Sequence, residues 1–69
     1  MTKHLEECLI KLKNKYHAGE EFKSDDISPV LFSRSKYVLN KLVENDKLKK
    51  RLEFYERTLN LIAYYSLLN

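Results

Sequence analysis

The stretch SRSKYVLNKLVENDKLKK, residues 33–50, decides how this chain folds. Its apolar residues recur at the three- and four-residue spacing that gathers side chains on one face of an α-helix. They are Val38, Leu39, Leu42 and Val43. The tripeptide Ser33-Arg34-Ser35 offers a serine to cap the start of this helix, and Asn45-Asp46 can end it in a left-handed turn. We therefore predict an amphipathic helix over about residues 34–45.

The opposite face of this predicted helix is polar and largely basic. It carries Lys36, Tyr37, Asn40, Lys41 and Glu44. Residues 33–51 together hold seven basic side chains against two acidic ones, in a chain whose net charge is +3. A polyanion is the natural partner of such a concentration, although a solvated lysine-rich surface is the plainer explanation of it. Charge alone therefore leaves the function open.

Residues 47–68 fit two different structures. Read at helical spacing, they form one long helix whose apolar stripe is Leu48, Leu52, Tyr55, Leu59 and Ile62. Read in alternation, they form two strands, 47–54 and 59–66, with Glu56-Arg57-Thr58 between them. The composition of the second strand favours a sheet, whereas the lack of an Asn-Gly or Asp-Gly turn disfavours a hairpin. Periodicity leaves both structures open.

The N-terminal residues predict a regular helix. Thr2 can cap it, and it runs to about Tyr16, with Gly19 as its left-handed C-cap. Its apolar stripe is Leu5, Cys8, Leu9, Leu12 and Tyr16. We expect this stripe to face the same core as the helix over residues 34–45.

The segment between these two helices predicts a shorter element. A brief extended piece holds Phe22, and Ser24 can then cap a second helix. Pro29 must shorten or interrupt that helix, because proline has no backbone N–H to donate. We expect a short or irregular helix over about residues 24–31.

The size of the chain limits what it can do. Sixty-nine residues allow one domain with a small core, and with Cys8 as the only cysteine no disulfide can form within the chain. Oligomerisation is then the expected source of added stability. No apolar run approaches the length of a membrane span and no signal-peptide pattern is present, so we expect a cytoplasmic protein. No catalytic set or metal-ligand spacing can be assembled, so we expect no enzyme activity, cofactor, metal or small-molecule substrate.

The order of these segments resembles that of winged helix-turn-helix DNA-binding proteins. The similarity runs from Phe22 to Ser66. The motifs that carry it are Ser24-Asp25-Asp26-Ile27, then Ser33-Arg34-Ser35, then Val38-Leu39-Asn40-Lys41-Leu42-Val43-Glu44-Asn45-Asp46-Lys47-Leu48-Lys49-Lys50, and finally Ala63-Tyr64-Tyr65-Ser66-Leu67. The chain looks closest to the small stand-alone versions found in archaea, their viruses and their plasmids.

The resemblance implies an α+β fold of three helices plus a C-terminal β-hairpin wing, as a single winged-helix domain over residues 1–69. It further implies a transcriptional regulator that binds double-stranded DNA. The recognition helix, about 34–45, would lie in the major groove, and the wing, about 47–66, on the backbone or in the minor groove. The implied DNA-binding residues are Arg34, Ser35, Lys36, Tyr37, Asn40, Lys41, Lys49, Arg51 and Arg57. Among them, Arg34 would fork to guanine and Asn40 would pair with adenine.

A homodimer would place two recognition helices in successive major grooves. We expect it to form through the first helix and the C-terminal strand, because Ile10, Leu67 and Leu68 exceed what one small core can absorb. Two alternatives stay open: a winged-helix module that binds an acidic protein instead of DNA, and a helical adaptor in which residues 47–68 form one helix.

Overall fold

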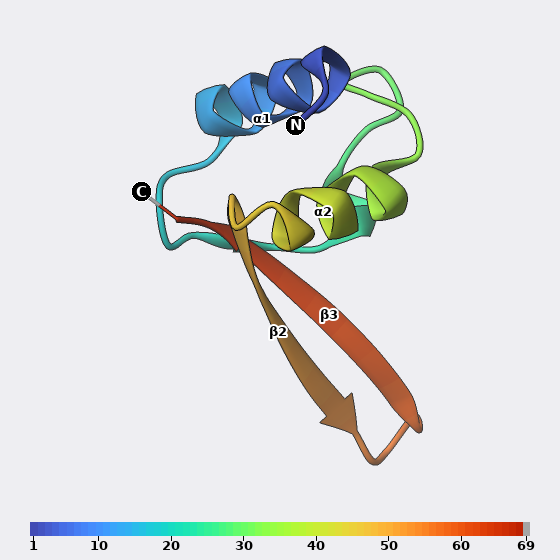
Figure 1. Ribbon diagram of the computed structural model, residues 1–69. Helices are drawn as coiled ribbons and strands as arrows, with labels where there is room; N and C mark the ends of the chain where they lie inside the picture. The colour runs from blue at the N-terminus through green and yellow to red at the C-terminus, as the bar shows by residue number, and fades with distance from the viewer. Residues whose placement is uncertain (69) are drawn as a thin grey trace.

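Two α-helices lie against a three-stranded antiparallel sheet in the computed structural model, which describes residues 1–68 (Figure 1). The helices are α1, Lys3–Lys15, and α2, Ser35–Glu44. The strands are β1, Glu21–Phe22, β2, Leu48–Tyr55, and β3, Asn60–Leu67, with β3 in the middle. A 3₁₀ helix, η1, Ser24–Asp26, lies between β1 and α2. The chain is therefore an α+β protein.

The predicted winged helix-turn-helix of three helices plus a wing is wrong. Residues 24–31 hold only the single turn of η1, and the chain then passes through turns to α2. Pro29 has no N–H for a helical hydrogen bond, and the hydroxyl of Ser28 accepts one from the backbone N–H of Val30 at 3.1 Å. The hairpin is not a separate wing either, because β1 pairs with the C-terminal end of β3 and so makes a three-stranded sheet.

Residues 47–68 form two strands and not one long helix. Asp46 has a φ of 58°, which reverses the chain directly after α2. In the hairpin Leu48 lies opposite Leu67, and Tyr55 lies opposite Asn60. Leu48 and Leu67 are both buried, so the strand register places apolar side chains from both ends of the segment in the core. The observed strand bounds are shifted by one residue from the predicted ones.

The first helix begins as predicted and ends differently. The hydroxyl of Thr2 accepts a hydrogen bond from the backbone N–H of Leu5 at 3.2 Å, which confirms Thr2 as the N-cap. The helix ends at Lys15 with an extended Tyr16, and not at a left-handed glycine. Gly19 has a φ of 83° in the following turn, where its N–H donates to the Leu67 carbonyl at 3.2 Å.

The core lies between the two helices and the base of the sheet. Its members share very low exposure and come from every element except η1: Leu5, Cys8, Leu9, Leu12, Phe22, Ile27, Phe32, Val38, Leu39, Leu42, Leu48, Tyr65 and Leu67. The predicted stripes of both helices are thus confirmed, except that Tyr16 and Val43 are only half-buried. Leu67 belongs to this core and is not a spare apolar contact.

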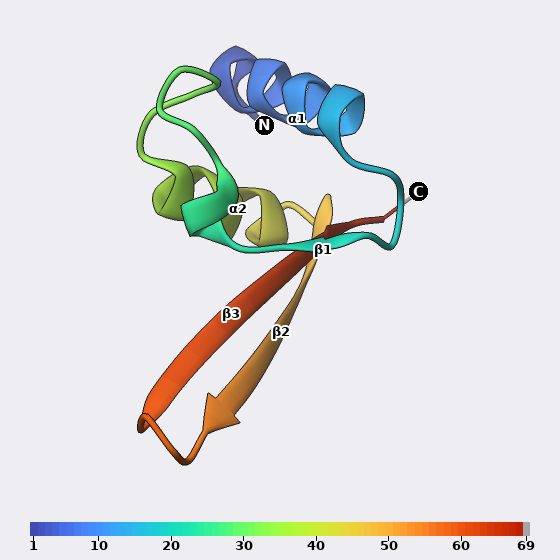
Figure 2. The same ribbon diagram turned by 180° about the vertical axis from the view of Figure 1, so that it is seen from behind.

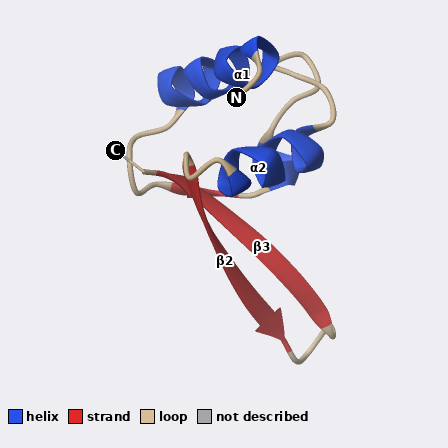
Figure 3. Ribbon diagram, viewed as in Figure 1, coloured by secondary structure: helices blue, strands red, loops and turns tan. Residues whose placement is uncertain are grey.

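The outer part of the β2–β3 hairpin projects well beyond the helices. The molecule measures 40 × 24 × 20 Å along its principal axes, and the hairpin accounts for the long one (Figure 3). Seen from behind, β1 lies beside β3 only at the base of the hairpin, and the distal part carries no covering element (Figure 2). No helix among residues 1–68 combines the length and the apolarity that crossing a membrane requires.

Candidate nucleic-acid interface

The outward face of α2, together with the N-cap residue Arg34, presents three basic side chains, Arg34, Lys36 and Lys41, against the single acidic Glu44. Val38, Leu39 and Leu42 are buried, which fixes the helix against the core and turns its other side to solvent. At 10 residues, α2 is about 15 Å long. Its N-cap is Arg34, in the left-handed conformation with a φ of 54°, and neither Ser33 nor Ser35 takes that position.

Tyr37 sits on this face between two cations. The Arg34 guanidinium carbon lies 4.4 Å from the ring centroid and the Lys41 ammonium lies 5.6 Å from it. Such contacts are attractive because the face of an aromatic ring carries partial negative charge. The ring is 48% exposed, so Tyr37 is a surface residue. Arg34, Tyr37 and Lys41 therefore form one exposed cluster.

Lys41 also has an acidic neighbour. Its ammonium lies 3.2 Å from the Glu44 carboxylate, and this hydrogen-bonded contact raises the pKa of Lys41. Both side chains are well exposed, so the pair contributes little to stability and can separate when a stronger anion arrives. Lys41 thus stays charged and within reach of a phosphate.

Asn40 does not occupy the role that the resemblance implied for it. Its side-chain oxygen accepts a hydrogen bond from the Tyr65 hydroxyl at 2.8 Å and another from the Lys50 ammonium at 3.1 Å. Pairing with adenine uses the oxygen and the amide nitrogen of an asparagine together. Since the oxygen already joins α2 to the hairpin, Asn40 is a structural bridge in this conformation.

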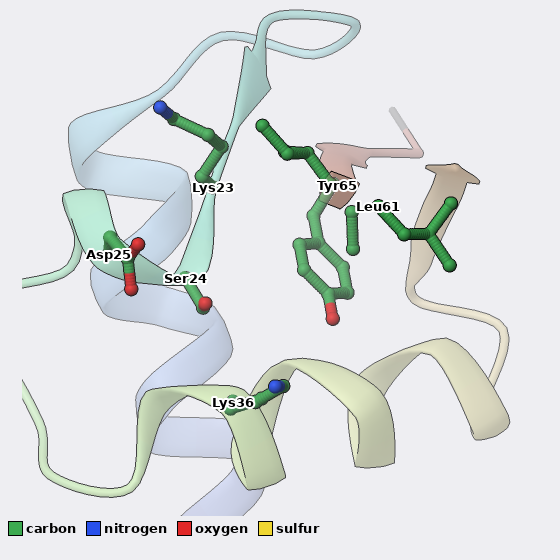
Figure 4. A pocket seen from close by; sticks show the side chains of 8 residues that line it. Lys23, Ser24, Asp25, Lys36, Leu61 and Tyr65 are labelled. Atoms are coloured by element: carbon green, nitrogen blue, oxygen red, sulfur yellow. The ribbon is translucent and has the colours of Figure 1, made fainter. Parts of the chain in front are cut away.

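Ser35 is likewise turned inward. Its hydroxyl donates to the Ser24 carbonyl at 3.1 Å and so ties the start of α2 to η1. The same corner contains a hollow of about 230 Å³ between η1, α2 and the hairpin (Figure 4). Lys36 lines that hollow and is exposed. Of the two neighbours, Lys36 is therefore the one that can reach a ligand.

Arg51 is held within the sheet. Its guanidinium donates to both carboxylate oxygens of Glu21, at 2.8 and 2.9 Å, and to Glu53 at 2.7 Å, and it lies 4.5 Å from the ring centroid of Tyr64. The Arg51 hydrogen bonds lower the pKa of Glu21, and the two carboxylates raise the pKa of Arg51. This arrangement locks β2 to β1 across β3. A second cation, Lys49, is exposed two residues earlier on the same strand.

Arg57 lies in the turn at the tip of the hairpin and is exposed. It is far from α2 along the long axis of the molecule (Figure 1). Residues 52–61 contain Glu53 and Glu56 beside this single arginine, so the distal hairpin carries no positive charge excess. A phosphate contact there would rest on one side chain.

The structure thus divides the nine implied DNA-binding residues. It brings Arg34, Tyr37 and Lys41 together on the outward face of α2, and it places Lys36 in the hollow beside the hairpin. Ser35, Asn40 and Arg51 make contacts inside the protein, and Lys49 and Arg57 stand apart from the cluster. Sequence reasoning missed the roles of Glu21 and Tyr65 because their partners are 30 and 25 residues away along the chain. Among residues 1–68, no group of His, Cys, Asp and Glu side chains is arranged to hold a metal ion.

No protein-family model matches this chain, and neither the curated proteins nor the solved structures show a significant match to it. The function is therefore argued from the geometry of the α2 face.

Proposed function

We propose that this protein binds double-stranded DNA through the outward face of α2 and acts as a DNA-binding regulator. The observation that carries the proposal is the exposed cluster of Arg34, Tyr37 and Lys41 with Lys36 beside it at the N-terminal end of the helix. A helix N-terminus adds partial positive charge to these cations. A helix of about 15 Å fits a major groove about 12 Å wide when it lies along it.

Within this proposal the cations have different roles. Arg34 and Lys36 stand at the start of the helix, where a helix inserted into the groove meets base edges. Lys41 lies about a turn and a half further on and suits a backbone phosphate, as do the exposed lysines at the base of the hairpin. Asn40 is left out of base reading because its oxygen is already hydrogen-bonded.

The test is the affinity for a fluorescently labelled duplex, measured by anisotropy between about 50 and 200 mM salt. The double variant Arg34→Ala/Lys36→Ala is expected to bind at least several-fold more weakly at low salt. Lys41→Ala, which removes a phosphate contact, is expected to make the salt slope shallower by about 1. The matched control is Lys3→Ala/Lys13→Ala, which removes the same charge from exposed positions of α1.

Two results would count against the proposal. One is the lack of measurable duplex binding by the parent protein at low salt. The other is an equal loss of affinity in the α1 control, which would mean that net charge and not the α2 face attracts the DNA. A selection from random duplexes then separates sequence-specific binding from binding to the backbone alone.

Protein binding without DNA is the competing candidate, and one observation favours it. The distal hairpin exposes large apolar side chains, with Leu52, Phe54 and Leu61 all more than half exposed. None of these residues belongs to the proposed DNA interface, although Leu61 lines the same hollow as Lys36, so Leu52 and Phe54 are the positions whose variants test protein binding separately.

A further inference from the structure

The distal hairpin has one apolar face that nothing in the described chain covers. In an antiparallel pair, residues directly opposite each other point to the same face. Leu52 lies opposite Ala63, and Phe54 lies opposite Leu61. These four residues, here called the apolar strip, continue the face on which Tyr65 enters the core. Ala63 is partly buried against the core, whereas the three large side chains of the strip are 55–63% exposed.

The other face of the same ribbon is mostly polar, with the half-buried Ile62 as its aliphatic member, and its polar side chains bond to one another. Tyr55 and Tyr64 share a hydrogen bond of 2.7 Å, which raises the pKa of Tyr55 to about 12. Beside them, Arg51 bonds to Glu53 and lies over the ring of Tyr64. A ribbon with one face adapted to water and one bare apolar face normally packs that apolar face against something.

We infer that the apolar strip is the contact surface of a homodimer, in which two hairpins pack face to face about a two-fold axis. The strip shares no residue with the proposed DNA interface, although Lys36 of that interface lines the same hollow as Leu61 and Ala63. The dimer does not depend on DNA binding. The charge pattern favours a second copy over a polyanion, because Glu53 and Glu56 outnumber Arg57 in the distal hairpin. The strip itself has no charged member, so two copies of this basic chain can meet there without placing like charges in contact.

The strip supplies part of a dimer interface. Its three large side chains expose an apolar patch of a few hundred Å², the size of the largest patch on a typical monomer, and such patches are often functional. Two such patches bury less than the roughly 1,200 Å² of a specific interface, so the dimer needs contacts outside the strip as well. The hollow beside the strip supplies further contact, because a two-fold arrangement can bring the tip of one hairpin to the base of the other. The tip carries Glu56, and Lys23 is one of the residues that line the hollow, so the two can form a contact of opposite charges.

Edge-to-edge pairing of two β2 strands is the other way to join two hairpins. It would satisfy the open edge of β2 but would leave both apolar strips exposed. Face-to-face packing removes them from water, and for that reason it is the favoured arrangement. The contact predicted from sequence uses the first helix and the C-terminal strand and rests on Ile10, Leu67 and Leu68. Ile10 is 58% and Leu68 46% exposed, and Leu67 is buried in the core. None of the three belongs to the strip, although Leu61 and Ala63 lie on the same C-terminal strand.

The test is the mass of the full chain in solution without DNA, by sedimentation equilibrium from about 10 to 200 µM. The parent protein is expected to show twice the 8.3 kDa chain mass. Leu61→Glu is expected to raise the dimer dissociation constant at least tenfold, because a two-fold axis places two new carboxylates in an apolar contact. Ile10→Glu makes the same change at a similarly exposed position on α1 and should leave the dimer intact.

Three results would overturn the inference: a parent protein that is monomeric at about 200 µM, a dimer that Leu61→Glu does not weaken, or a dimer that Ile10→Glu dissociates. Circular dichroism confirms that each variant keeps its fold, and Leu61→Asn replaces Leu61→Glu if that variant unfolds. Since no DNA is present, failure of the proposed DNA binding leaves these outcomes unchanged. The DNA experiment likewise uses variants outside the strip.

Discussion

The Asn40 bridge provides a direct test of whether that residue serves the fold or reads DNA. Tyr65 is only 1% exposed, and its hydroxyl donates to the side-chain oxygen of Asn40 at 2.8 Å. Replacing Asn40 with alanine removes the acceptor and leaves the hydroxyl of this buried side chain without its partner. A base-reading asparagine on an exposed helix face could be replaced at almost no cost in stability.

The expected loss can be worked from this geometry. A buried donor left without its acceptor costs about 1–3 kcal/mol, and the exposed Lys50 contact adds little to that. In a domain of this size each kcal/mol lowers the melting temperature by roughly 4–8 °C. Tyr65→Phe removes the donor itself, so it strands no hydroxyl and should cost about 0.5–1.5 kcal/mol. Once Tyr65 is phenylalanine, Asn40→Ala should cost almost nothing more.

The assay is urea unfolding followed by circular dichroism, at one fixed protein concentration, for the parent and the three variants of this cycle. We expect a favourable coupling energy of about 1 kcal/mol or more between Asn40 and Tyr65. Additive effects would refute the reasoning, as would an Asn40→Ala variant as stable as the parent. If Asn40→Ala is as stable as the parent but binds the duplex more weakly, Asn40 contacts DNA and is not a structural bridge.

Two further predictions concern the hairpin and its lock. The Arg51 hydrogen bonds lower the pKa of Glu21 below its ordinary value of 4.5, so its stabilising effect is present above that pH and is lost as the pH falls through the lower folded value. Thermal unfolding between about pH 3 and pH 7 should therefore show a shallower acid decline for Glu21→Gln than for the parent, and parallel curves would exclude the lock. Leu59 has a φ of 55° at the hairpin turn and is 77% exposed, a conformation that asparagine tolerates better. Leu59→Asn should therefore stabilise the protein by about 0.5–1 kcal/mol in urea unfolding, and a destabilised variant would contradict the left-handed turn.

The two regular helices could be predicted from sequence because their signals are local. The stripe of α1 and its Thr2 cap lie within a few residues of each other, and so do the apolar positions of α2. The prediction of a short helix over residues 24–31 was wrong because Ser24 is the residue type that caps a true helix. Pro29, five residues later, prevents a helix from extending through this segment. The resemblance to winged helix-turn-helix proteins then implied three helices, whereas the chain has two α-helices and one 3₁₀ turn.

The hairpin illustrates a different limit of sequence reasoning. Residues 47–68 satisfy helical spacing and strand alternation at once, and local propensity cannot choose between them. The choice depends on Leu48 and Leu67, which reach the same core only when the chain folds back on itself. That information is tertiary, as is the pairing of β1 with β3 that completes the sheet.

The site residues follow the same division. Residue type and helical phase located the exposed cations of α2 correctly, because outward-facing positions on a helix follow from its buried ones. They could not show that the side chains of Asn40 and Arg51 are already hydrogen-bonded within the protein. Their partners, Tyr65 and Glu21, are distant in the sequence and are brought close only by the pairing of the strands. A long polar side chain near a sheet can therefore be predicted from sequence to bind a ligand when it in fact forms hydrogen bonds within the protein.

The hydrogen bond between Asn40 and Tyr65 also limits which residues of α2 could recognise DNA bases. With the Asn40 oxygen bonded to Tyr65, adenine recognition through that residue would require breaking a contact to a buried hydroxyl. The cost of about 1–3 kcal/mol is comparable to the roughly 1–3 kcal/mol that one bidentate base contact provides. Readout by Asn40 would therefore yield little net discrimination. Any sequence preference of α2 must rest on Arg34 and Lys36, which give up no buried partner on binding.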